Sequence, residues 1–225
     1  MMTLRNVSAN GFSDISFESG TGRSVKIIVD SDDEKNLLLR LVTGLQKPDA
    51  GEVLLFGKEI YSISEDEYIK LFEKAAVVPG NGGLISNLRV WENITLPIEY
   101  HQGINPQDLE DRIIRIVRRL LGINTDIERI EKLMQQLPGH LSPHEKRVVG
   151  VVKAFIAEPE VIIYDSIFEG LNPEMQDELT TMTTQFHKEK AGRVSLYLTS
   201  DEYSLRKAPA DIILRQAGTE LKEMR

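Results

Sequence analysis

The amino-acid sequence predicts an α/β domain in which helices cover a mainly parallel sheet. Two short runs of apolar residues, at 25–29 and 161–164, are typical of strands buried on both faces. A segment of helical periodicity follows each run. Between residues 90 and 157 the pattern is almost wholly helical. The chain therefore reads as a sheet domain with a helical insertion.

The elements are expected in the following order. The N-terminal part contains strands at 3–7, 15–18 and 25–29, a helix at 37–45, a strand at 52–56, a helix at 64–74 and a strand at 75–78. The middle part contains helices at 90–100, 106–121, 126–136 and 143–157. The last part contains a strand at 161–164, a helix at 173–188, a strand at 194–198, a short helix at 204–207 and strands at 211–215 and 220–222.

The length of 225 residues fits one domain with an insertion. We expect a core lobe at about 1–85 and 158–225 and a helical insertion at about 86–157. The chain is 41% hydrophobic and 28% charged, as is usual for a soluble globular protein. It has no apolar run of about 20 residues and no signal-peptide pattern. We therefore expect a cytoplasmic protein, with any membrane association peripheral.

The formal net charge of -8 argues against nucleic acid as a partner, because phosphate backbones require a basic surface. One basic run stands out, and its spacing favours the solvated face of a helix: Arg112, Arg115, Arg118 and Arg119. The chain has no cysteine, and its four histidines lack metal-ligand spacing. We therefore expect no metal site.

The run at 25–29, the polar turn at 30–36 and the following helix have the layout of a phosphate-binding loop. In such a loop, glycine N–H groups and a helix N-terminus surround a phosphate, beside a lysine and a hydroxyl that binds Mg²⁺. Lys35 has the position of that lysine. The turn has no glycine, and Asn36 replaces the hydroxyl residue.

Four carboxylates surround this turn: Asp30, Asp32, Asp33 and Glu34. Ser31 and Glu34 have the spacing of a capping box, and acidic residues suit the start of a helix. Two interpretations remain open. The acids are either exposed residues of a helix start, or they fill the place of the missing phosphates and pair with Lys35.

Several segments resemble the ATP-binding subunits of ABC transporters, in the family's order and spacing. They are KIIV at 26–29, LLLRLVTGL at 37–45, KPDAGEVLLFG at 47–57, AAVVPGNGGLISNLRVWENITLP at 75–97 and LPGHLSPHEKRVVGVVKAFIAEPEVIIYDSIFEGLNPE at 137–174. The resemblance covers nearly the whole chain and implies the P-loop NTPase fold of the ABC ATPases. The stretch 81–96 is also similar, more weakly, to ATPases of Mce-associated lipid transporters.

The resemblance assigns positions to the family's motifs, and most have changed. Lys35, Asn36 and Asp165 are vestiges of the Walker motifs, and Gly80 stands where a glutamine is expected. The signature sequence is replaced by Ser142, Pro143, His144 and Glu145. Ser166 replaces the catalytic glutamate, Asn172 the D-loop aspartate and Ser200 the switch histidine. Asp165 either marks a metal site or bonds to the neighbouring turn at 31–36. Phe12 is the nearest candidate to stack on adenine, with a core role as its alternative.

The resemblance implies a catalytically degenerate subunit that scaffolds or regulates a membrane transporter. Its expected partners are a permease and either a second copy or a second ABC ATPase, at the inner face of the membrane. We expect no catalytic residues and no cofactor, with weak binding of ATP and Mg²⁺ as the alternative. There are two other hypotheses. The chain is an unusual active ATPase that uses Lys35 and Asp165, or it is a soluble adaptor. The permease contact is expected around Leu84, Ile85, Leu88 and Trp91, which could also be core residues.

Overall fold

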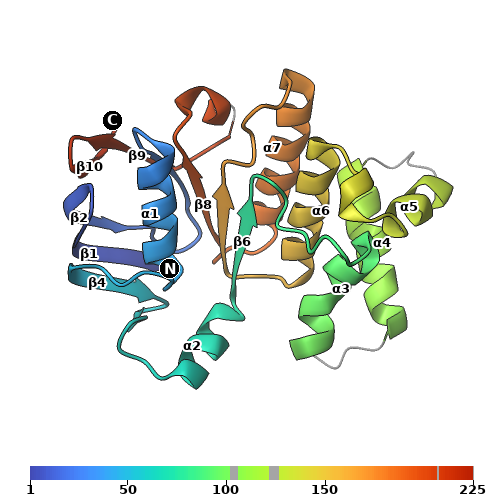
Figure 1. Cartoon of the computed structure of the whole chain (residues 1–225), viewed down its shortest axis with the longest axis horizontal. Coiled ribbons are helices and arrows are strands. Elements are labelled where there is room, and N and C mark those ends of the chain that lie inside the picture. The colour runs from blue at the N-terminus through green and yellow to red at the C-terminus, as the bar shows by residue number, and fades with distance from the viewer. Residues whose placement is uncertain (102–105, 122–126, 207, 225) are drawn as a thin grey trace.

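Two β-sheets and a group of helices make up the chain, with the sheets on one side and most of the helices on the other (Figure 1). The computed structural model describes residues 1–101, 106–121, 127–206 and 208–224. None of the helices among these residues is long and apolar enough to cross a membrane.

The larger sheet has the strand order β10-β9-β3-β8-β7-β6 and is parallel except for the β9–β10 hairpin. Its strands are β3 (Ser24–Ile28), β6 (Ala75–Pro79), β7 (Val161–Asp165), β8 (Val194–Thr199), β9 (Ile212–Ala217) and β10 (Glu220–Glu223). Every residue of β3, β7 and β8 is buried, because the sheet is covered on both faces.

The smaller sheet is antiparallel and has the order β2-β1-β4-β5. Its strands are β1 (Met2–Ala9), β2 (Phe12–Glu18), β4 (Ala50–Leu55) and β5 (Lys58–Glu59). Both β1 and β2 carry buried and exposed residues, as in a sheet with one face on the core. Register shifts in the pairing of β1 with β2 and β4 interrupt a strict alternation.

Seven α-helices are described: α1 (Asp32–Val42), α2 (Glu65–Phe72), α3 (Val90–His101), α4 (Pro106–Leu121), α5 (Ile127–Met134), α6 (Pro143–Ile156) and α7 (Pro173–Lys188). Two short 3₁₀ turns, η1 (Pro138–His140) and η2 (Glu202–Leu205), complete the described elements. The helices α3 to α6 follow one another between β6 and β7. The division into a core lobe and an insertion remains a prediction from the sequence.

Two hydrophobic cores lie on opposite faces of the larger sheet. Successive residues of a strand point to opposite faces, so Ile162 and Tyr164 join the core formed with α3 to α7. Val161 and Ile163 join the second core, formed with α1 and the smaller sheet. The prediction of an α/β fold is confirmed.

Some element bounds differ from the sequence-based expectation. The first helix begins at Asp32, five residues before the expected start, because its first turn is polar and carries no hydrophobic periodicity. Strand β2 begins at Phe12, three residues early, and the two-residue strand β5 was not predicted. The helix α1 ends at Val42, before Gly44, which has φ of 75°.

Candidate functional site

A buried cluster lies at the carboxyl ends of the parallel strands, where ligands bind in open α/β sheets. Lys35 of α1 extends towards the end of β7. Its Nζ atom lies 3.0 Å from Asp165 Oδ1 and donates a hydrogen bond of 3.0 Å to Ser166 Oγ. All three residues are at most 9% exposed. The interpretation that Asp165 bonds to the turn at 31–36 therefore agrees with the structure.

Lys35 remains a cation in this cluster. Burial alone would lower its pKa, but the hydrogen bond and charge of Asp165, with the charges of Asp32 and Glu169, outweigh burial and raise the pKa. A charged ammonium with three donors can neutralise Asp165 and still bond to Ser166. It cannot act as a general base at neutral pH.

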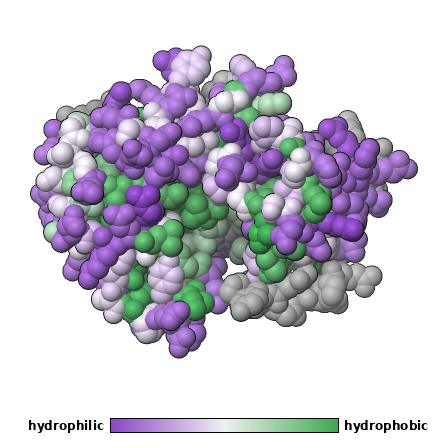
Figure 2. All heavy atoms as spheres, viewed as in Figure 1, coloured by the Kyte–Doolittle hydropathy of each residue, from purple (hydrophilic) through white to green (hydrophobic). Residues whose placement is uncertain are grey.

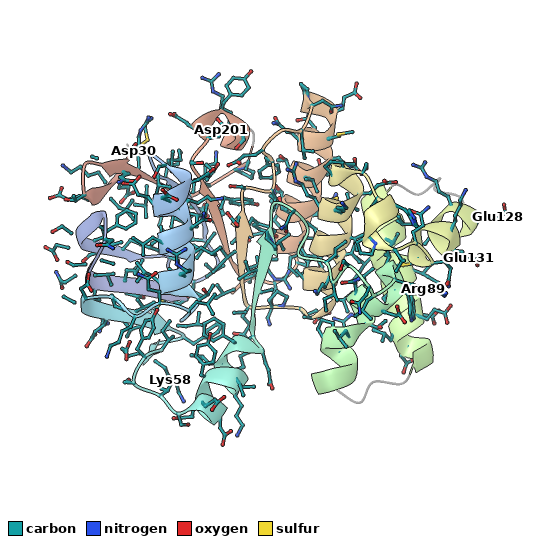
Figure 3. The ribbon with its side chains drawn as sticks, in the orientation of Figure 1. Asp30, Lys58, Arg89, Glu128, Glu131 and Asp201 are labelled. Carbon is teal, nitrogen blue, oxygen red and sulfur yellow. The ribbon has the colours of Figure 1, made fainter. Side chains whose placement is uncertain are left out.

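Asp32 links the start of α1 to the end of β8. Ser200 Oγ donates a hydrogen bond of 2.6 Å to Asp32 Oδ1, which also lies 3.6 Å from Lys35 Nζ. The hydrogen bond from Ser200 and then the charge of Lys35 lower the pKa of Asp32. Ser200 thus bonds to the acidic turn of its own chain. Asp30, after β3, and Asp201, after β8, lie at the same end of the molecule (Figure 3).

Glu34 is also held by the chain itself. Its Oε2 atom accepts a hydrogen bond of 2.9 Å from Ser31 Oγ, and its Oε1 atom accepts one of 2.6 Å from Gln216 Nε2 of β9. Ser31 Oγ in turn accepts from the Glu34 N–H at 3.2 Å. Only one half of the predicted capping box is present, because the Glu34 carboxylate bonds to side chains and not to the Ser31 N–H. Gln216, which is buried, was not identified from the sequence.

Asn36 lies outside the cluster. Its side chain is exposed and has no hydrogen bond among the residues that the structure describes. Asp33 is exposed as well. Phe12 is 4% exposed and belongs to the hydrophobic core, so its ring is not free to stack on a base. Its core role is therefore the correct interpretation.

The end of β7 makes a tight turn beside the loop after β6. Ser166 has φ of 52°, which is unusual for a residue with a side chain, and its N–H donates to Leu198 O at 2.9 Å. A Cβ atom on Gly80 would lie 2.9 Å from Ser166 O. A side chain at position 80 would therefore require this turn to move. Arg147 of α6, which the sequence analysis missed, donates to Gly80 O and fixes the loop from the other side.

The signature-like residues form the start of α6. Ser142 is its N-cap and Pro143 its first residue. Ser142 and Glu145 form a complete capping box, with bonds of 2.8 Å from Ser142 N and 3.2 Å from Glu145 N. The bond from the Ser142 N–H lowers the pKa of Glu145. His144 Nε2 lies 3.1 Å from Glu178 Oε2 of α7, so this segment is tied to its own helices.

The four residues expected to contact a partner occupy different environments. Leu84 and Trp91 are partly buried and pack against the helical core. Ile85 is 42% exposed, and Leu88 is partly exposed. Asn93, fully buried, accepts from the Ile85 N–H at 2.7 Å and donates to the carbonyl oxygens of Ile85 and Leu88, which fixes the loop.

A groove of about 250 Å³ lies between β6 and the helices α3 and α6. Figure 2 shows apolar surface on both sides of a hollow between the sheets and the helices. The groove is lined by residues outside the predicted set, among them Val77, Pro97 and Lys153. Trp91 lines a separate pocket between α3, α4 and α5. The described residues contain no group of acidic or histidine side chains that could hold a metal ion.

The fold is that of the ATP-binding cassettes. The dimeric structure of MJ0796, described as a bacterial ABC transporter cassette, has a TM-score of 0.84 at 19% identity and covers 100% of this chain and 98% of that chain. The structure of cbiO1 from Clostridium perfringens, part of the ABC transporter complex cbiONQ, has a TM-score of 0.79 at 19% identity, with 98% and 86% covered. These likenesses show the fold.

The chain belongs to the ABC transporter family, whose model matches residues 12–169. The methionine import ATP-binding protein MetN 1 of Acinetobacter baylyi is 26% identical over 78% of this chain and 47% of its own length. A sulfate/thiosulfate import ATP-binding protein of Cucumis sativus is 26% identical over 96% of this chain and 60% of its own length. The chain spans about half the length of most of these curated relatives.

Proposed function

We propose that this chain is a nucleotide-binding-type subunit of an ABC transporter that does not hydrolyse ATP and instead scaffolds or regulates the assembly. One observation carries the proposal: Lys35 Nζ lies 3.0 Å from both Asp165 Oδ1 and Ser166 Oγ. The lysine of the phosphate-loop position is thus bound to oxygens of the protein itself. The carboxylates of Asp165 and, at 3.6 Å, of Asp32 take the electrostatic role of the missing phosphates.

The residues of the turn do not fit a magnesium triphosphate. The turn at 30–36 contains no glycine whose backbone could approach a phosphate closely. Asp32 and Asp33 add negative charge at the start of α1. Two like charges 4 Å apart repel by about 4 kcal/mol near a protein surface. Such repulsion, reduced by solvent at exposed side chains, would weaken the binding of a triphosphate.

The groups needed to activate water are also missing. Ser166 stands at the position of the catalytic glutamate, and its hydroxyl cannot accept a proton unaided near neutral pH. Ser200, at the position of the switch histidine, bonds to Asp32 instead. At position 80, where the family has glutamine, the close approach of Ser166 O leaves no room for a side chain.

The proposed partners are a permease and a second nucleotide-binding subunit, either another copy of this chain or a complete ABC ATPase. The relatives named above are import ATP-binding proteins, which supports a place at the cytoplasmic face of a membrane transporter. We propose that the permease contacts the groove between β6 and α3, together with the exposed side chain of Ile85. In such an assembly this chain would keep the subunits in their relative positions and would limit the activity of its partner ATPase.

Two alternative functions remain, an active ATPase and a soluble adaptor, and one measurement distinguishes each of them from the proposed function. An unusual active ATPase would bind MgATP through Lys35 and Asp165, so nucleotide affinity discriminates it. A soluble adaptor would not co-purify with a membrane protein. The contacts of Lys35 with Asp165 and Ser166 favour the inactive subunit over the first of these.

The test is steady-state hydrolysis of MgATP by the purified chain, with Lys35→Ala and Ser166→Glu variants. We expect no turnover by the wild type, and none by Ser166→Glu, because phosphate binding must precede activation of water. Turnover that survives in Lys35→Ala would indicate a contaminating ATPase. Turnover that Lys35→Ala abolishes would refute the proposal, and a gain in Ser166→Glu would show that the acidic turn is not the obstacle.

A further inference from the structure

An open cavity lined by both charged and apolar side chains lies outside the Lys35 cluster. Its volume is about 660 Å³, and its walls come from α4, the ends of α6 and α7 and the segments that follow these two helices. Its lining includes none of the residues of the Lys35 cluster, so the cavity is separate from the candidate site.

Arg193 forms one wall of this cavity and is only 3% exposed. Its Nε atom donates to Pro159 O at 3.0 Å, another guanidinium nitrogen donates to Phe186 O, and its Cζ atom lies 3.5 Å from the centre of the Phe186 ring. Burial lowers the pKa of Arg193, but an arginine side chain stays protonated at neutral pH. A desolvated cation thus faces the cavity.

No carboxylate of the described residues forms an ion pair with Arg193, whose polar partners are both carbonyl groups. The C-terminus of α7 offsets about half a unit of charge. Buried charges in proteins are ordinarily paired, because an isolated buried ion is costly. Glu158 and Glu189 also line the cavity, and the charge of Glu158 opposes the lowering of the Arg193 pKa. Neither carboxylate is within ion-pair distance of Arg193, so in the described part of the chain its charge is offset only from a distance.

Arg115 lines the same cavity from α4 and belongs to the basic run of the sequence. It is exposed, and among the described residues its side chain donates only to Asp111 O of its own helix, from Nε at 3.2 Å. Arg112, by contrast, pairs with Glu158 at 2.7 Å. The side chains of Arg118 and Arg119 lie outside the described residues. The cavity is thus lined by more basic than acidic side chains, since Arg112, Arg115, Lys190 and Arg193 face it with Glu158 and Glu189, in a chain of net charge -8. Arg115 and Arg193 are the two of these arginines that form no ion pair with a described carboxylate.

We propose that this cavity binds a small anionic ligand through phosphate or carboxylate oxygens, held between Arg115 and Arg193. Guanidinium groups bind both kinds of oxygen with two parallel hydrogen bonds. The remaining wall includes Ile116, Met182 and Phe186, which suit an apolar part of the ligand. The proposal is independent of the proposed function, because it uses none of the residues around Lys35.

The experiment titrates the whole chain with pyrophosphate and with citrate, by calorimetry and by NMR of the arginine Nε–H groups. A parallel arm measures co-sedimentation with phosphatidylcholine vesicles that contain phosphatidylglycerol. We expect binding of one anion per chain that shifts the Nε–H signals of Arg115 and Arg193. Arg115→Ala should weaken binding about tenfold, as expected for one charged hydrogen bond.

The matched control is Arg5→Ala, which removes an exposed arginine of β1 that pairs with Glu52. It should leave the affinity within about twofold, since the loss of one distant surface charge is largely screened. Binding to vesicles alone, with the same dependence on Arg115, would identify a lipid headgroup as the source of the anion. The proposal is overturned if none of the probes binds at millimolar concentration, or if both variants weaken binding equally.

Discussion

Lys35 has three oxygen neighbours, contributed by Asp165, Ser166 and Asp32. Its ion pair with Asp165 is the interaction most sensitive to substitution at the site, because both side chains are nearly buried. Removing one partner leaves the other charge uncompensated in a region with little water. We therefore propose a structural role for this lysine in the free protein.

We predict that Lys35→Met lowers the free energy of unfolding by about 2 kcal/mol, below the range for fully buried pairs. The pKa of Lys35 is raised in the folded state, so its contribution is complete below the unfolded pKa of about 10.4 and is lost as pH rises through the folded value. Urea unfolding between pH 7 and 11 measures both effects. An Asp165→Asn variant and the double variant complete the cycle, and additive losses would contradict direct coupling.

The residues at the start of α1 both cap the helix and bond to residues of the larger sheet and its connections. Ser31 caps the helix, and the acids of its first turn suit the helix dipole. Unlike the acids of an ordinary helix start, Asp32 also bonds to Ser200 after β8, and Glu34 to Gln216 of β9. The turn is thus fastened to two strands of the sheet.

Replacing both Asp32 and Asp33 with Gly should lower the free energy of unfolding by about 2 kcal/mol, from lost dipole interactions and added backbone entropy. The matched control replaces Glu65 and Asp66, in the first turn of α2, with Gly. It removes the same charges from a helix that also has a serine cap, so the α1 variant should lose more, because Asp32 also bonds to Ser200 and Lys35. Thermal or urea unfolding gives the comparison. Equal losses would mean that the link to β8 adds nothing, and an unchanged midpoint would reject the capping account.

At the scale of the whole molecule, the loop after β6 joins the candidate site to the proposed permease contact. Gly80 lies against Ser166 at one end of the loop, and Asn93 holds Ile85 near the other. Exposed apolar side chains remain on this side of the fold, including Val77 and Ile85. Exposed apolar residues that lie close together often mark the contact surface for a partner.

We predict that Val77→Asp and Ile85→Asp each reduce co-purification of the chain with its membrane component at least tenfold, because a buried charge in an apolar contact is unfavourable. Leu45→Asp is the control, since Leu45 is 75% exposed on the turn after α1, away from the groove. Circular dichroism establishes that the variants are folded. If both variants bind as the wild type does, the contact lies elsewhere; if the wild type never co-purifies, the transporter assignment itself fails.

Much of the fold could be predicted from the sequence, because the buried positions of helices and strands are hydrophobic and recur with the period of each element. The buried runs of β3, β7 and β8 and the helical pattern from 90 to 157 indicated a covered parallel sheet and its α-helical part. The order and spacing of the motifs indicated the family and the positions of Lys35, Asp165 and Ser166 in it. The first turn of α1 could not be predicted from hydrophobic periodicity, because the cap and the residues that follow it are polar.

The contacts that define the site could not be predicted in the same way. Lys35 meets Ser166 across 131 positions, Asp32 meets Ser200 across 168, and Glu34 meets Gln216 across 182. The sequence by itself determined which residue types stand at the ends of the strands. Only the tertiary structure decided which of them touch, because parallel strands bring their carboxyl ends together through long crossover connections whose geometry leaves no local pattern.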